Sequence, residues 1–149
     1  MTSALSGPGR LLAPIHRLFS SVPESLLLLA SRVFPAAIFW QSGRTKVDGF
    51  ALHDTALFLF QEEYRIPLLS PEVAASLAAV GEHVFPVLLV LGLGTRFAAL
   101  ALIGMTLVIQ TFVYPDAWPT HGVWAAALLW VVAKGPGGWS LDCMAGLDR

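Results

Sequence analysis

Two adjacent ionisable residues, Glu82 and His83, lie near the middle of an apolar run, Val73–Leu93, that is about long enough to cross a bilayer. A carboxylate at that depth costs roughly 2.5–3.5 kcal/mol on insertion-based scales unless it is paired, hydrated or protonated. The first apolar run, Val22–Ser42, carries Arg32 about halfway along. Because arginine suits a partly buried contact with a carboxylate, we expect an Arg32–Glu82 pair to link two helices. Such a pair would either fix helix register or form part of a proton or redox-ligand site.

The neighbouring histidine does not share a face with the carboxylate, because successive helical residues are about 100° apart. A haem would need an axial histidine, often two, at matching depth. The other histidines, His16, His53 and His121, lie outside the apolar runs or near the end of one, so a haem is not expected. We expect His83 either to hydrogen-bond within the helix bundle or to line a cleft large enough for a quinone.

A polar line also runs along the third apolar segment. Thr106, Gln110 and Tyr114 follow one another at intervals of four residues and therefore lie on one helical face. In a membrane this face must point into the bundle or toward water. Hydrogen bonding between helices is the simpler interpretation. The alternative is a candidate cleft for a quinone or another small ligand, formed by these three residues and His83.

A third group of residues could bind a divalent transition metal. His53, Asp54, Asp116 and His121 offer nitrogen and oxygen ligands on one predicted side of the membrane. Their spacing is not that of a compact ligand motif, and solvated loops are commonly acidic. Metal binding or transport is therefore kept as a further alternative. The single cysteine, Cys143, can form neither an internal disulfide nor, alone, a cysteine-based metal site.

The composition indicates that lipid is the solvent of most of the chain. Of the 149 residues, 13% are charged and 56% are hydrophobic, whereas soluble domains average about 25% charged residues. The net charge of −1 gives no electrostatic case for binding nucleic acid. We predict one integral membrane domain over residues 21–142, with an N-terminal tail over 1–20 and a C-terminal tail over 143–149.

Four helical spans are expected to position these side chains. Proline, glycine and serine residues delimit them, and the short connections after the second and third spans force antiparallel neighbours. The spans are Val22–Ser42, Pro71–Leu93, Arg96–Tyr114 and Pro119–Lys134. The predicted fold is therefore an all-α, antiparallel four-helix membrane bundle. Within the first connection, Ala51–Tyr64 predicts an extra interfacial or re-entrant helix whose phenylalanines dip into lipid.

The distribution of basic residues predicts the orientation of the bundle. With four spans, the N-terminal tail, the turn between the second and third spans and the C-terminal end share one side of the membrane. That side carries Arg10, Arg17, Arg96, Lys134 and Arg149. The positive-inside rule then places both termini in the cytoplasm.

Several segments together resemble the DoxX family. Arg32, Gly43 and Lys46 resemble its R-x10-G-x2-K element, and Glu82 followed by Gly92–Arg96 is similar to its E…GL-x-TR segment, which includes Thr95 and Arg96. The ending Gly135–Asp142 is similar to its GPG-x2-SLD close. The resemblance covers roughly Leu28–Asp142 and carries these segments in the family's order.

The resemblance implies a small four-helix protein of the bacterial inner membrane. The family is named after a subunit of a sulfur-metabolising, quinone-linked oxidase system, and other members are linked with oxidative stress, thiol handling or metal-binding peptides. We therefore expect an accessory membrane subunit of a redox, oxidative-stress or metal-stress system, with soluble or membrane protein partners. A quinone-interacting oxidoreductase subunit is the alternative. Because the sequence has no cysteine pair, nucleotide loop or nucleophile triad, an enzyme acting alone is not expected. Self-association into a homo-oligomer is left open.

Overall fold

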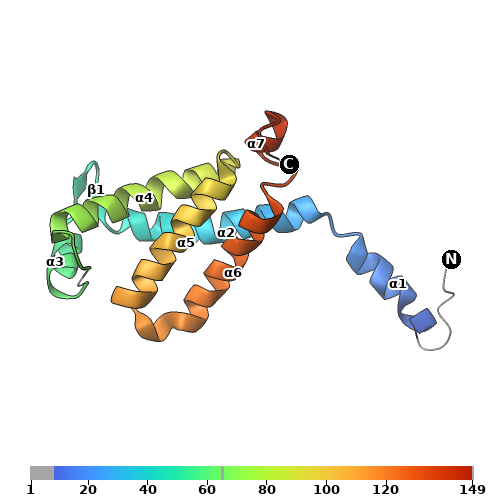
Figure 1. Cartoon of the computed structure of the whole chain (residues 1–149), viewed down its shortest axis with the longest axis horizontal. Coiled ribbons are helices and arrows are strands. Elements are labelled where there is room, and N and C mark those ends of the chain that lie inside the picture. Colours follow the sequence, from blue (N-terminus) through green and yellow to red (C-terminus); the bar gives the residue numbers. More distant parts are fainter. Residues whose placement is uncertain (1–8, 65, 149) are drawn as a thin grey trace.

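The computed structural model describes residues 9–64 and 66–148 (Figure 1). Apart from one β-hairpin with two strands of two residues each, the regular structure of the described part is helical. Its elements in chain order are α1 Gly9–Ser20, α2 Glu24–Arg44, β1 Val47–Asp48, β2 Ala51–Leu52, α3 Asp54–Glu62, α4 Pro71–Leu91, α5 Thr95–Phe112, the 3-10 helix η1 Pro115–Ala117, α6 Trp118–Lys134 and α7 Leu141–Met144.

The four long helices form the predicted bundle. Helix α2 contacts α4 and α6, and α5 contacts the same two neighbours. By length and composition α2, α4 and α5 could each cross a membrane, and α6 has 17 residues. The predicted spans agree with these helices within two residues at each end. The all-α, multi-pass membrane fold predicted from the sequence is confirmed.

Small buried residues allow the helices to approach closely. Ala75, Ala98 and Ala99 are fully buried between helices, which is typical of packed rather than lipid-facing surfaces. Larger side chains complete the core, among them Phe39, Leu89, Leu102, Leu128 and Val131. Many other large apolar side chains are exposed on the outside of the bundle, as expected for surfaces that face lipid.

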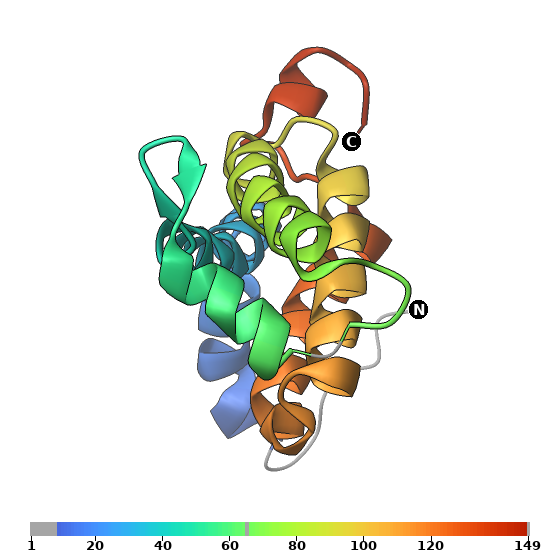
Figure 2. The same cartoon turned by 90° about the vertical axis from the view of Figure 1, so that its left-hand side faces the viewer.

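Helix α3 confirms the expected short helix between the first two spans, but its surroundings differ from the prediction. Figure 2 looks from the α3 end and shows this helix in the foreground, beside α4. Phe60 is only 6% exposed and packs against Ala74 and Ala75 of α4, whereas Phe58 is 58% exposed. Only part of the phenylalanine face is therefore free for lipid. The protein side of α3 is set by Ala56 and Phe60, four residues apart.

The N-terminal tail contains an unpredicted helix, α1, which projects away from the bundle (Figure 1). Its side chains Leu12, Ile15 and Phe19 are spaced at i, i+3 and i+7 and are exposed. That spacing is typical of an amphipathic helix at a membrane surface.

Candidate functional site

The carboxylate of Glu82 forms a buried ion pair with Lys46. The Lys46 Nζ lies 2.7 Å from Glu82 Oε2 and donates to Oε1 at 3.0 Å. The hydroxyl of Ser42 also donates to Oε1, at 3.2 Å, and accepts from Lys46 Nζ at 2.9 Å. The Glu82 side chain is 3% exposed and that of Lys46 is 14% exposed. Two residues near the end of the first span thus satisfy the charge in the middle of α4.

The predicted ion pair between Arg32 and Glu82 does not form. Helices α2 and α4 are antiparallel, and a side chain on Gly43 would meet Glu82 and His83, whereas one on Gly92 would overlap the Arg32 guanidinium. Arg32 therefore lies opposite a point ten residues beyond Glu82 on α4, which corresponds to about 15 Å along a helix. Because the two helices are displaced along their axes, the residues at their midpoints do not face each other.

The true surroundings of Arg32 are the C-terminal segment. The residue is fully buried, and its Nη2 donates to the backbone carbonyl of Trp139. The nearby carboxylate of Asp142 interacts electrostatically with the guanidinium. Arg32 therefore connects the first span to the segment after α6, at the end of the bundle opposite α3.

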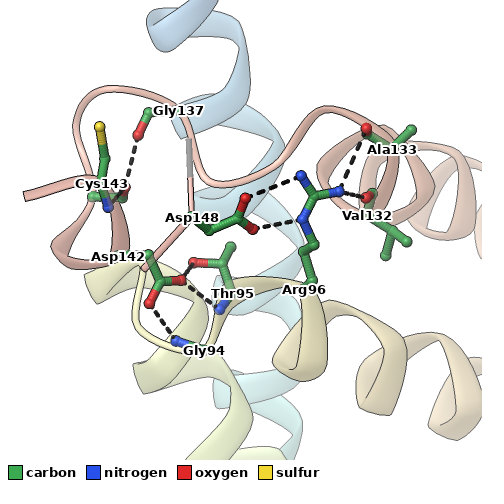
Figure 3. Close-up of polar contacts among 10 residues, drawn as sticks. Gly94, Thr95, Arg96, Val132, Ala133, Gly137, Asp142, Cys143 and Asp148 are labelled. Atoms are coloured by element: carbon green, nitrogen blue, oxygen red, sulfur yellow. Dashed lines mark hydrogen bonds and ion pairs between the residues drawn. The ribbon is translucent and has the colours of Figure 1, made fainter. Parts of the chain in front are cut away.

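Asp142 caps the N-terminus of α5 from a distant part of the chain (Figure 3). Its carboxylate accepts from the backbone N–H groups of Gly94 and Thr95, both at 2.9 Å, and from Thr95 Oγ1 at 2.7 Å. Burial raises the pKa of Asp142, but these three hydrogen bonds outweigh it and bring the pKa below its usual value. The cap joins two of the segments that resemble DoxX elements.

Arg96 makes a second connection at the same end (Figure 3). Its guanidinium forms a two-point ion pair with Asp148, through Nε and Nη2, and its Nη1 donates to the carbonyl of Val132. Lys134 lies 3.5 Å from Glu24, so the start of α2 is also close. The predicted family residues Thr95 and Arg96 thus hold helix ends together, while Gly43 and Lys46 belong to the contact with α4.

A cavity of about 530 Å³ lies among α2, α3, α4, α5 and α6, and the Lys46–Glu82 pair lines it. Most of its wall is apolar and aromatic. Phe39, Phe60, Phe85, Met105, Ile109 and Trp124 are among the apolar residues, and Ser42, Tyr64, Tyr114 and His121 add polar groups. A largely apolar cavity of this size with a few polar groups is the usual form of a small-molecule site.

Two tyrosines join different segments at the cavity wall. The hydroxyls of Tyr64, after α3, and Tyr114, after α5, are 2.7 Å apart, and their rings meet edge to face. Burial raises the pKa of Tyr64, and its hydrogen bond with Tyr114 raises it further. The Tyr64 phenol therefore stays protonated near neutral pH, and the pair can offer a hydroxyl to a ligand.

The other predicted cleft residues are separated by the structure. Tyr114 lines the cavity, and Gln110 lies behind it, bonded to His121 at 2.6 Å. Thr106 instead donates to the Leu102 carbonyl of its own helix. His83 does not line this cavity, since its Nδ1 bonds the Ala79 carbonyl at 2.6 Å and its ring meets the edge of Trp40. The polar line on α5 thus contributes both a contact between helices and a cavity group.

The four predicted metal ligands are not brought together. Across residues 9–64 and 66–148, no group of three or more His, Cys, Asp or Glu side chains could hold a metal ion. His53 instead accepts from the Thr55 backbone at the start of α3, and His121 belongs to the cavity. His121 thus lies with the cavity residues and not with His53, Asp54 and Asp116, although most of the cavity residues are distant from it along the chain.

Some site residues were not identified as such from the sequence. Ser42, Tyr64 and Trp124 line the cavity, and Lys46 was noted only as part of a family element. One usable signal was Gly43, because a glycine inside a span marks a close helix approach and thereby the part of α2 that faces α4. No comparable signal marks Tyr64, which lies in an irregular connection.

This fold defines a multi-pass membrane protein with an internal apolar cavity. The DoxX family profile matches residues 27–115, which is more than half of the chain, so the protein belongs to the DoxX family. The resemblance inferred from the sequence is confirmed. No curated protein matches the chain, and no solved structure does.

Proposed function

We propose that this DoxX-family protein binds a quinone-class molecule inside the bacterial inner membrane, as the membrane subunit of a redox system. The observation that carries the proposal is the cavity of about 530 Å³ whose apolar wall contains a buried Lys46–Glu82 pair and His121. A quinone has a flat apolar ring with two polar oxygens, so it needs this combination of surfaces.

The fit concerns both size and chemistry. Small-molecule cavities generally measure about 300–1,000 Å³, and this one lies within that range. Aromatic side chains such as Phe39, Phe85 and Trp124 can pack against a ring. Lys46 can donate to a ring oxygen, and the Tyr64–Tyr114 pair offers another donor.

Access from the lipid supports a ligand that is dissolved in the membrane. Leu77 of α4 and Gly104 and Val108 of α5 line the cavity and are also exposed on the surface of the bundle. Apolar, exposed lining residues on neighbouring helices allow entry sideways between them. A water-soluble ligand would instead need a polar path, and none of these three residues has a polar side chain.

A partner protein completes the proposal. The sequence has one cysteine and therefore no thiol pair that could exchange electrons with a quinone by itself. We infer that electrons come from, or pass to, a soluble or membrane partner on one side of the bundle. The excess of basic residues near the termini supports a cytoplasmic location for both of them.

The experiment uses the purified protein in detergent and compares the same substitution at two glycines, Gly104 and Gly122. A Cβ on Gly104 or on Gly122 would meet no atom within 4 Å, but only Gly104 lines the cavity. Leucine at either position is compatible with a helix. Gly104→Leu should remove quinone from solvent extracts of the protein and abolish the rise in melting temperature caused by a short-chain ubiquinone. Gly122→Leu should leave both unchanged.

Three results bear on the proposal in different ways. Loss of quinone binding in Gly104→Leu alone supports it. Equal binding by both variants would show that quinone associates elsewhere and would contradict the cavity assignment. A wild-type protein that neither carries quinone nor is stabilised by it at saturating concentration would refute the proposed function.

A further inference from the structure

Gln110 has a fixed orientation because of the carbonyl that it contacts. Its Nε2 donates to the backbone oxygen of Pro115 at 2.6 Å. That oxygen can only accept hydrogen bonds, so the reversed amide would place two acceptors against each other. The amide oxygen of Gln110 must therefore face the other way, toward α6.

The fixed amide in turn sets the tautomer of His121. Gln110 Oε1 lies 2.6 Å from His121 Nδ1. Because an amide oxygen only accepts, Nδ1 must carry the proton of this hydrogen bond. In the neutral imidazole the second nitrogen, Nε2, then has no proton and presents a lone pair.

The position of the ring makes this lone pair available to a ligand. His121 is 5% exposed, lines the cavity and packs against Trp124 with 4.9 Å between ring centroids. Within the described part of the chain, no side chain or backbone group bonds to Nε2. Nε2 is not one of the fully buried side-chain atoms that lack a partner, so it remains accessible, and a ligand in the cavity that donates a hydrogen bond can reach it.

We propose that His121 makes the cavity selective for the reduced, hydroquinone form of its ligand by accepting a hydrogen bond from a phenolic hydroxyl at Nε2. This inference rests on the proposed function and adds the redox form of the bound molecule. A hydroquinone has two O–H donors, whereas the oxidised ring has only acceptor oxygens and would oppose the lone pair. Gln110 is a positioning residue, because it acts on the ligand only through the histidine.

The donors on the cavity wall do not cancel this preference. Lys46 Nζ and the tyrosine hydroxyls can donate to an oxygen of either redox form. They therefore contribute affinity without distinguishing the two. Two cavity acceptors, His121 Nε2 and the Glu82 carboxylate, match only the reduced form, but the carboxylate is already engaged by Lys46 and Ser42. His121 Nε2 is therefore the acceptor that is left for the ligand.

The test compares dissociation constants of a short-chain benzoquinone and of its hydroquinone, measured under anaerobic conditions by quenching of tryptophan fluorescence. In the wild-type protein the hydroquinone should bind about tenfold more tightly, the size expected for one matched rather than opposed hydrogen bond. His121→Phe should remove the difference by weakening hydroquinone binding. Gln110→Leu should reduce the difference, and Gly104→Leu should weaken both forms equally.

A second measurement keeps the proposal testable if a variant does not fold. The ¹⁵N spectrum of the ligand-free wild-type protein should show His121 with a protonated Nδ1 and an unprotonated Nε2. A protonated Nε2, or equal binding of the two redox forms in the wild-type protein, would overturn this inference while leaving quinone binding intact. If neither form binds, both the inference and the proposed function fail.

Discussion

At the scale of single residues, the membrane interior contains a lysine–glutamate pair where an arginine–glutamate pair was expected. Lysine can reach Glu82 from just beyond the end of α2 because its long apolar stem crosses the helix surface while its ammonium group meets the carboxylate. Ser42 then satisfies part of both charges. The partners of the buried carboxylate thus come from the end of α2 and from just beyond it, and not from a charged residue in the middle of that span.

This pairing predicts a specific pattern of stabilities. Lys46→Met or Glu82→Leu alone should lower the free energy of unfolding by about 3–5 kcal/mol, because each leaves an uncompensated buried charge. The double variant should be less destabilised than the sum of the two. The measurement is reversible unfolding in mixed micelles. Arg32→Met with Glu82→Leu serves as the control and should be additive, and strict additivity for the Lys46 pair would contradict the contact.

Asp142 predicts a loss of stability in acid. Its pKa is lowered in the folded protein, so its contribution is fully present above the unfolded value of about 3.9 and is lost as the pH falls through the folded pKa. Asp142→Asn should lower the melting temperature at pH 7. It should also flatten the decline in melting temperature at acid pH, as measured from pH 6 down to pH 3. An unchanged acid decline in the variant would show that other carboxylates cause it.

At the scale of helices, the close approach at Gly43 sets the register between α2 and α4. A Cβ at this position would lie 2.8 Å and 2.9 Å from two atoms of the His83 ring and 3.0 Å from Glu82 Cβ. The register in turn places Lys46 beside Glu82 and moves Arg32 toward the C-terminal segment. The absence of a side chain at Gly43 therefore determines that Lys46, and not Arg32, lies beside Glu82.

Gly43→Ala should consequently destabilise the bundle by about 1–3 kcal/mol through overpacking. Removing the opposing ring in Gly43→Ala/His83→Ala should recover a large part of that loss. Gly122→Ala is the control, because its Cβ would meet nothing within 4 Å and should be neutral or stabilising. Thermal unfolding in one detergent compares all of these variants. Absence of rescue by His83→Ala would mean that the ring is not the obstacle.

The four long helices of the bundle were predictable from the sequence, and the offset of α2 and α4 along their axes was not. Apolar length and the flanking prolines and glycines defined the spans to within two residues. The axial offset between α2 and α4 depends on a side-chain contact at Gly43, which span length does not encode. Likewise, Gln110 and His121 are eleven residues apart across a turn, and only the packed α5–α6 pair brings them together. The cavity is formed by five elements together, so no short stretch of the sequence indicates it.

At the scale of the whole molecule, the two ends of the bundle differ in construction. One end gathers the α4–α5 turn, the end of α6 and the C-terminal segment through Asp142, Arg96 and Lys134. The other carries α3, the β-hairpin and η1 (Figure 1). The first end closes the bundle with ionic contacts, and the cavity lies toward the second.

The proposed orientation can be tested by labelling single cysteines. In a Cys143→Ser background, Phe50→Cys in the hairpin turn and Met144→Cys in α7 replace side chains that are fully and 80% exposed. If the termini are cytoplasmic, a membrane-impermeant maleimide should label position 50 in intact spheroplasts. It should label position 144 only after the cells are permeabilised. The reverse pattern would invert the topology.

The cap on α5 also has a consequence for the order in which the protein is made. Its carboxylate lies 47 residues after Thr95, beyond the whole of α6. A chain grows from its N-terminus, so the turn between α4 and α5 is synthesised 47 residues before its cap. The N–H groups of Gly94 and Thr95 first depend on water or on insertion machinery for their hydrogen bonds. Asp142 replaces those temporary partners only once the segment after α6 has been synthesised and packs back onto the α4–α5 turn.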